Sequence, residues 1–153
     1  MAEHDRIGPP DKSGQATESF GDGAGGGTTL TTSWVTGAAV DVKRRSGATI
    51  RVKYVKGSET TGRVRVMVAK GATAPALDSV LWTVAGELGT ASSGVRALQK
   101  GEVTLTPADF DATDYVVFDV SCRGADWLKT DAKYVGGSSP GSVYTEVWGA
   151  WGL

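Results

Sequence analysis

The amino-acid sequence predicts an all-β protein, an antiparallel β-sandwich or jelly roll of about eight strands with an extended N-terminal arm. Apolar and polar residues alternate with period two in several short segments, as they do in half-buried strands. Twenty-two glycines in 153 residues suit many turns and disfavour helices. No segment shows the apolar spacing of three and four that helices require, so a parallel sheet covered by helices is not expected.

The first 27 residues differ in composition from the rest of the chain. Their only large apolar side chains are Ile7 and Phe20, and the segment ends in a glycine-rich run. Two basic side chains against five acidic ones give this segment a charge of −3 and leave +2 for the remainder. Such a segment buries too little apolar surface to offset its ordering entropy. We therefore predict a Gly-rich acidic arm over residues 1–27 and a β-sandwich domain over residues 28–153.

Eight segments are expected to form strands, in the order Thr28–Thr36, Ala48–Tyr54, Arg63–Val68, Ser79–Val84, Glu102–Thr106, Tyr115–Val120, Trp127–Val135 and Ser142–Trp151. The second and third segments alternate most cleanly, and the polar turn between them predicts a hairpin. In the fourth, Trp82 shares one face with Val80 and Val84, so we expect it in the core. Tyr115–Val120 is apolar on both faces, which indicates a central strand.

Charge and composition exclude several classes of protein. The formal net charge of −1 is too low for a general nucleic-acid binder. The single cysteine, Cys122, rules out an intrachain disulfide, and we expect it to be a small buried residue. The single histidine, His4, lies in the polar arm, which excludes Ser-His-Asp catalysis and poly-histidine zinc sites. Apolar runs are too short to span a membrane, and the N-terminus lacks a signal-peptide pattern, so we expect an intracellular location.

Several segments resemble the strands and front hairpin of small jelly-roll virion proteins of tailed bacteriophages. The similarity covers roughly residues 34–151 and is carried by Val40–Val42, Ala48–Tyr54, the turn Val55–Thr61, Arg63–Val68, Leu105–Phe110 and Val143–Trp151. It implies a structural virion component, a head decoration (cement) protein or a tail-associated protein. It implies no catalytic residues, and the acidic arm is not part of the pattern.

Two groups of acidic residues are candidates for a metal site or an active site. Asp109, Asp111 and Asp114 offer three carboxylates within six residues, as a Ca²⁺ site requires. The preceding Thr106-Pro107 is typical of a helix cap, so a simple turn is favoured over a metal site. A glycosidase would need two carboxylates across a cleft. The candidates are Glu59, Glu87, Glu102 and Glu146. None of them has neighbours in the sequence that would raise the pKa of its carboxyl group, as a general acid requires. We expect neither an enzyme nor a cofactor.

Contact residues are the remaining candidates. Arg51, Lys53, Arg63 and Arg65 point outward on the predicted hairpin, where four cations on one surface would favour an acidic partner such as the arm of a neighbouring subunit. The short basic run Lys43–Arg45 is expected to be a solvated loop. In the arm, the predicted apolar anchors are Ile7, Pro9, Pro10 and Phe20.

The five tryptophans could stack on sugars. They are Trp34, Trp82, Trp127, Trp148 and Trp151. The last two are three residues apart, so on one regular strand they would point to opposite faces.

These observations favour a structural virion protein, most of all a capsid decoration protein that binds the outside of a phage head and stabilises it by bridging subunits. Its expected partners are the major capsid protein or other virion proteins. We expect a homo-oligomer, with a trimer favoured, located in virions that are assembled in the host cytoplasm. The alternative is a tail- or fibre-associated module that binds host surface glycans through exposed aromatic side chains.

Overall fold

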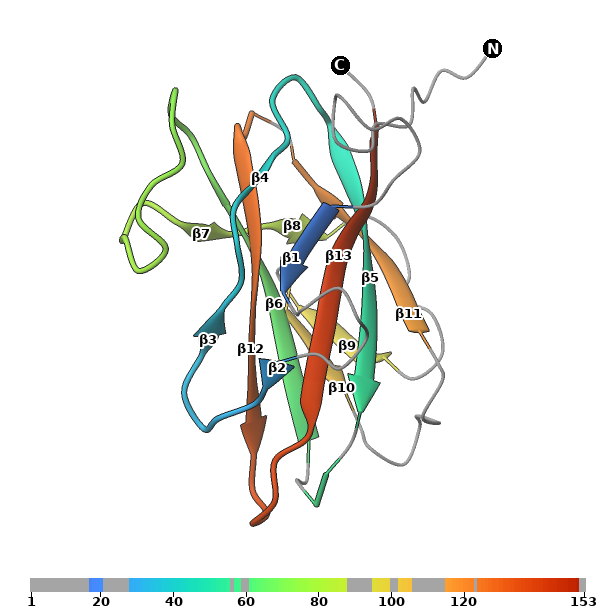
Figure 1. The fold of residues 1–153 in the computed structure, drawn as a ribbon. Coiled ribbons are helices and arrows are strands. Elements are labelled where there is room, and N and C mark those ends of the chain that lie inside the picture. Colours follow the sequence, from blue (N-terminus) through green and yellow to red (C-terminus); the bar gives the residue numbers. More distant parts are fainter. Residues whose placement is uncertain are drawn as a thin grey trace.

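A computed structural model of the chain describes residues 17–20, 28–55, 57–58, 61–87, 95–99, 102–105, 115–122 and 124–151. Over these residues it contains no helix and thirteen strands, which form two antiparallel sheets (Figure 1). The predicted all-β sandwich is therefore confirmed. The number of strands exceeds the predicted eight because several of them are only two residues long.

The first sheet, sheet A, has the strand order β1-β13-β5-β11-β8, with β2 also pairing with β13. Its strands are β1 (Thr17–Phe20), β2 (Thr28–Thr29), β5 (Gly47–Val55), β8 (Gly86–Glu87), β11 (Tyr115–Ser121) and β13 (Ser142–Trp151). The second sheet, sheet B, has the order β3-β12-β6-β10-β9, with β4 pairing with β12 and β7 with β6. Its strands are β3 (Val35–Thr36), β4 (Val40–Asp41), β6 (Thr61–Ala69), β7 (Thr83–Val84), β9 (Val95–Gln99), β10 (Glu102–Leu105) and β12 (Trp127–Val135).

The chain crosses between the two sheets at several of its connections. The connections from β5 to β6, β10 to β11, β11 to β12 and β12 to β13 all change sheet. The strands on either side of each of these connections thus lie in opposite sheets, and each of the long strands pairs with strands distant in sequence.

The predicted hairpin is wrong, because its two strands lie in opposite sheets. β5 pairs with β13 and β11, whereas β6 pairs with β12 and β10. Both strands bury one face, and the chain passes from one sheet to the other between them. Period-two alternation determines which side chains point inward, but it does not identify the neighbouring strand.

The core lies between the sheets and contains the inward side chains that the alternation predicts. Ile50, Val52 and Tyr54 of β5 are buried, as are Val64 and Val66 of β6. The two sheets are also joined by a polar contact inside this core, where the hydroxyl oxygens of two buried threonines lie 2.5 Å apart. They are Thr130 of β12 and Thr145 of β13.

The segment Ser79–Val84 departs from its predicted strand. Only Thr83–Val84 is a strand, and Val80 is 94% exposed because the residues before it form turns. Trp82 is buried as predicted, but it packs in a separate small cluster with Met67 and Ala69.

Two other predicted strands differ from the structure. Thr28–Thr36 is interrupted by a bend and contains only β2 and β3. β11 has neighbours on both sides only at Val120 and Ser121, so it is not central along its length over the described residues.

Strand β1 lies within the segment that composition assigns to the arm. It pairs with β13, with Thr17 opposite Val147 and Phe20 opposite Thr145. Residues 17–20 therefore add a strand to sheet A. Further along β13, the register against β5 shifts between Val147 and Gly149. A regular alternation from Trp148 to Trp151 therefore does not hold, and the directions of those two side chains lie outside the description.

Candidate interaction surface

The four predicted outward cations are divided between two faces of the molecule. Arg51 and Lys53 lie on β5 in sheet A, and Arg63 and Arg65 lie on β6 in sheet B. The prediction of one surface with four cations is therefore wrong, because it depended on the hairpin. Acidic side chains from β12 and β13, strands distant in the sequence, also lie beside these cations.

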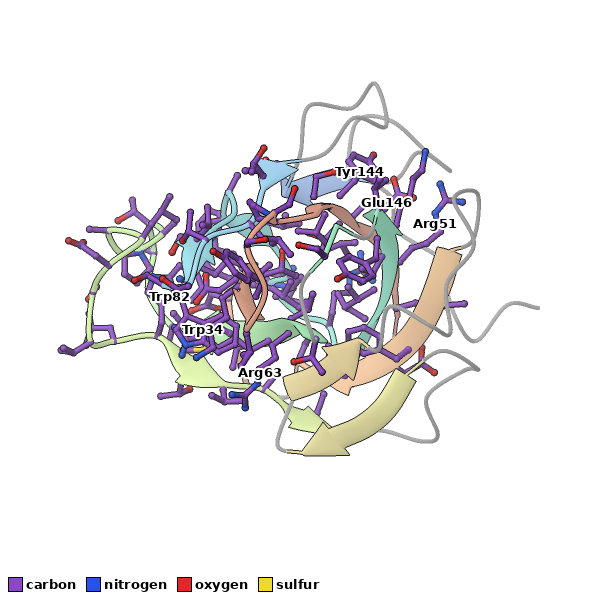
Figure 2. The ribbon with its side chains drawn as sticks, turned by 90° about the horizontal axis from the view of Figure 1, so that it is seen from below. Trp34, Arg51, Arg63, Trp82, Tyr144 and Glu146 are labelled. Atoms are coloured by element: carbon purple, nitrogen blue, oxygen red, sulfur yellow. The ribbon has the colours of Figure 1, made fainter. Side chains whose placement is uncertain are left out.

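On sheet A the outward polar side chains are paired with one another. Arg51 forms an ion pair with Glu146 through Nε and Oε1, and the Tyr144 hydroxyl donates to Oε2 of Glu146 over 3.0 Å (Figure 2). Glu146 and Tyr144 are both buried. The Thr49 hydroxyl, also on β5, donates to Asp119 of the neighbouring strand β11 over 2.8 Å. Arg51 and Glu146 therefore neutralise each other within this face.

On sheet B, cations surround a tryptophan. Pairing of β12 with β6 brings Lys133 opposite Arg63 and Asp131 opposite Arg65. The Trp34 ring lies among three of these side chains, with its centroid 4.3 Å from the Arg65 guanidinium, 4.6 Å from Lys133 Nζ and 6.0 Å from the Arg63 guanidinium. At these distances the ring quadrupole attracts a cation. We call Trp34, Arg63, Arg65 and Lys133 the cation–tryptophan cluster.

A buried carboxylate holds part of this cluster in place. Asp131 is 0% exposed, and its Oδ2 accepts a hydrogen bond from Nε of Arg65 and also lies 2.9 Å from Nη2. Its Oδ1 lies 2.7 Å from Nζ of Lys129, which is 2% exposed. One carboxylate therefore pairs with two cations, which leaves these three described side chains with a net positive charge.

Next to these charges, the connection between β6 and β7 exposes apolar side chains. Val80 is 94% exposed and Leu81 is 64% exposed, and Leu77 and Val84 are also exposed. We call residues 76–84 the apolar loop; Figure 1 shows this connection standing out from the sandwich. A pocket of about 400 Å³ adjoins it. The pocket is lined by Val68, Ala69, Lys70, Leu81, Thr83, Gly124 and Ala125.

Hydrogen bonds order this exposed connection internally and tie its beginning, at Gly71, to the body of the protein. The indole N–H of Trp82 donates to the carbonyl of Ala76 over 2.9 Å, and the backbone N–H of Ser79 also donates to it. Upstream, the indole N–H of Trp127 donates to the Gly71 carbonyl over 2.9 Å, and the Gly71 N–H donates to Asp126. The exposed side chains of Val80 and Leu81 thus lie on a hydrogen-bonded connection.

The remaining predicted site residues fall largely outside the description. Ile7, Pro9, Pro10, Asp109, Asp111, Asp114 and Glu59 lie outside the described residues. The same holds for the side chains of Phe20, Glu87, Glu102, Trp148 and Trp151, although their backbones lie in strands. In the part of the chain that is described, no three metal-ligating side chains gather.

Cys122 is confirmed as a small buried residue. It is part of the core between the sheets. Burial raises the pKa of its thiol to about 12, so the thiolate that would act as a nucleophile is suppressed.

Sequence reasoning missed several residues of this surface. Lys129, Asp131 and Lys133 alternate along β12, and that period-two pattern could have placed them on one outward face. The exposure of Leu77, Val80 and Leu81 had no such local signal.

Together these features define an antiparallel β-sandwich with cations around Trp34 on sheet B and exposed apolar side chains on the connection that follows β6. No family model, curated protein or solved structure matches the chain. Over the described residues, no helix is long and apolar enough to cross a membrane.

Proposed function

We propose that this protein is a structural virion protein, a capsid decoration protein that binds the outside of a phage head through sheet B. The observation that carries the proposal is the exposure of Val80 and Leu81 on a connection fixed by hydrogen bonds. Apolar side chains held in water in this way favour contact with another protein, since binding removes them from solvent. The virion assignment comes from the resemblance of β5, β6 and the closing strand to small jelly-roll virion proteins.

The physical effect of such a protein is to stabilise an assembled shell. A ligand that binds only the assembled state stabilises it by about 2.7 kcal/mol per site when present at 100 times its dissociation constant. Contacts that bridge neighbouring capsid subunits add this free energy to the lattice itself. We further propose that the protein acts as a symmetric homo-oligomer, with a trimer favoured, because identical copies then meet a locally symmetric lattice.

A host-glycan module is the competing assignment, and the surroundings of the described tryptophan rings disfavour it. Lys43 lies 4.3 Å from the Trp127 ring centroid, and Lys129 lies 5.3 Å from that of Trp82. Trp34 is approached by cations as described above. Rings with cations against them offer less open face for stacking on a sugar.

Co-sedimentation with phage heads assembled without this protein tests the proposal. We expect saturable binding by the wild type and at least tenfold weaker binding by the double variant Val80→Asp/Leu81→Asp, because charged side chains would have to be desolvated. The matched control is Val55→Asp, which changes a residue that is 37% exposed at the end of β5 in sheet A, outside the proposed contact face.

Thermal unfolding shows whether each variant folds as the wild type does. The proposal fails if the wild type does not bind heads, or if the loop variant binds as tightly as the control. Binding to host polysaccharide in place of heads would establish the glycan module.

A further inference from the structure

We infer that the cation–tryptophan cluster is a second contact site, which receives carboxylates of the partner protein beside the apolar loop. The identity of the partner rests on the proposed function, but the chemistry of the site does not. The cluster and the apolar loop belong to the same sheet, through β6, β12 and the connection that follows β6. An apolar patch bordered by charged and aromatic side chains is typical of a protein interface.

The charges of this face do not cancel. Arg65, Lys129 and Lys133 contribute three positive charges and Asp131 one negative charge among the described side chains. Glu102 of β10 stands opposite Arg65 in the register, and counting it still leaves an excess of one. Neighbouring cations on a sheet repel each other unless anions compensate their charge. A partner that supplies carboxylates relieves this repulsion.

Lys133 is the residue best placed to take such a carboxylate. Its ammonium has the Trp34 ring beside it, and over the described residues it forms no ion pair. Arg65, in contrast, is already committed to Asp131, which orients its guanidinium against the same ring. The arrangement therefore combines a fixed aromatic platform, an anchored guanidinium and an ammonium with remaining hydrogen-bonding capacity.

The part of the N-terminal arm that precedes β1 is a poor match for this site when supplied by a second copy. Residues 1–16 hold three acidic and two basic side chains, a charge of only −1. A nucleic acid would supply negative charge, but its phosphate backbone offers no apolar surface to cover the adjacent apolar loop. A protein surface with carboxylates around an apolar depression satisfies both features, and this is the partner we assign.

We expect this site to orient the partner protein during docking and to raise the rate at which the two proteins associate. Complementary charges at the edge of an interface raise the association rate, and salt weakens that effect. The apolar loop would supply affinity through burial, whereas the cation–tryptophan cluster would select carboxylate-bearing partners and set the orientation of docking. Loss of the cluster should therefore slow binding most at low ionic strength.

An eight-residue polyglutamate peptide, added to the intact protein labelled with ¹⁵N-tryptophan, tests the site without the natural partner. The Trp34 indole signal, assigned through Trp34→Phe, should shift saturably with polyglutamate and not with polylysine. Lys133→Glu should abolish the shift, whereas Lys53→Glu on sheet A should leave it unchanged. No shift in the wild type, an equal loss in both variants, or an equal response to an oligothymidylate of the same length would overturn the inference.

Heads assembled without the protein provide the second arm of the test. Lys133→Glu should lower the association rate about tenfold at low salt, and the difference should shrink as NaCl rises to about 300 mM. An unchanged rate at low salt overturns the inference while the proposed function stands. If the peptide acts as expected and the wild type fails to bind heads, the inference holds and the proposed function alone fails.

Discussion

The ammonium of Lys129 lies 2.7 Å from Oδ1 of Asp131, two residues along the same strand, and both side chains are buried on the outer face of sheet B. Outward positions of a two-sheet sandwich are ordinarily solvated. Here, Trp82 lies beside Lys129 and Arg65 pairs with Asp131. The Lys129–Asp131 pair therefore joins β12 to Trp82, the buried residue of the apolar loop.

Asp131→Asn should strongly destabilise the protein. The substitution leaves Lys129 buried without its carboxylate and weakens the anchoring of Arg65. Breaking a buried ion pair costs about 3 to 5 kcal/mol, because an uncompensated charge remains. Urea denaturation measures the change. The control is Asp41→Asn, whose exposed pair with Lys43 should contribute less than about 1 kcal/mol; equal losses in the two variants would contradict the buried-network interpretation.

Trp82→Phe should loosen the apolar loop more than it destabilises the whole protein. The variant loses the indole N–H that donates to the Ala76 carbonyl, a hydrogen bond worth about 1 kcal/mol. Limited proteolysis within residues 76–81 should become faster, since cleavage follows local opening. Trp34→Phe, which lies outside the loop, serves as the control. Proteolysis at the wild-type rate in Trp82→Phe would show that the indole bond does not hold the loop.

The threonine contact between the sheets should behave as a coupled pair. Thr145→Val removes the hydroxyl that lies 2.5 Å from that of Thr130, and each single replacement should cost about 1 kcal/mol. Thr130→Val/Thr145→Val should cost less than the sum, because both hydroxyls are then absent. Chemical denaturation of the four proteins gives the coupling energy. Additive losses would mean that the two hydroxyls do not interact.

Stability should decline at alkaline pH because of Cys122. Its pKa is raised to about 12 in the folded protein, so the unfolded chain ionises first as the pH rises. The stability linked to this thiol is present in full below the ordinary pKa near 9.0 and is lost as the pH rises from there toward 12.

Relative to Cys122→Ala, the wild type should lose about 1 kcal/mol between roughly pH 8 and pH 10. Urea denaturation of both proteins under reducing conditions, across this pH range, measures the difference. Parallel pH profiles would mean that the thiol ionises equally in both states.

For the long strands β5 and β6, the sequence was sufficient to predict which side chains point into the core. Ile50, Val52, Val64 and Val66 are buried as their alternation predicts, because backbone geometry alone sends successive side chains of a strand to opposite faces. The all-β class followed from the same pattern and from the many glycines. The resemblance to virion proteins supplied a function to propose, but alternation by itself identifies no partner.

Strand neighbours could not be predicted in this way. The turn between β5 and β6 has hairpin composition, yet the strands face each other across the core, since pairing depends on contacts distant in the sequence. β1 was missed for a related reason. Its composition is that of a poor strand, and pairing with β13 adds it to the sheet.

The sequence by itself therefore determined the inward and outward pattern of the strands and the chemistry available on each face. Only the tertiary structure decided that Arg63, Arg65 and Lys133 meet around Trp34, and that Lys129 and Asp131 are buried. The physical reason is that alternation is a local property of the backbone. The approach of cations to a ring, and the burial of an outward charge, depend on strands and loops that the fold brings from elsewhere in the chain.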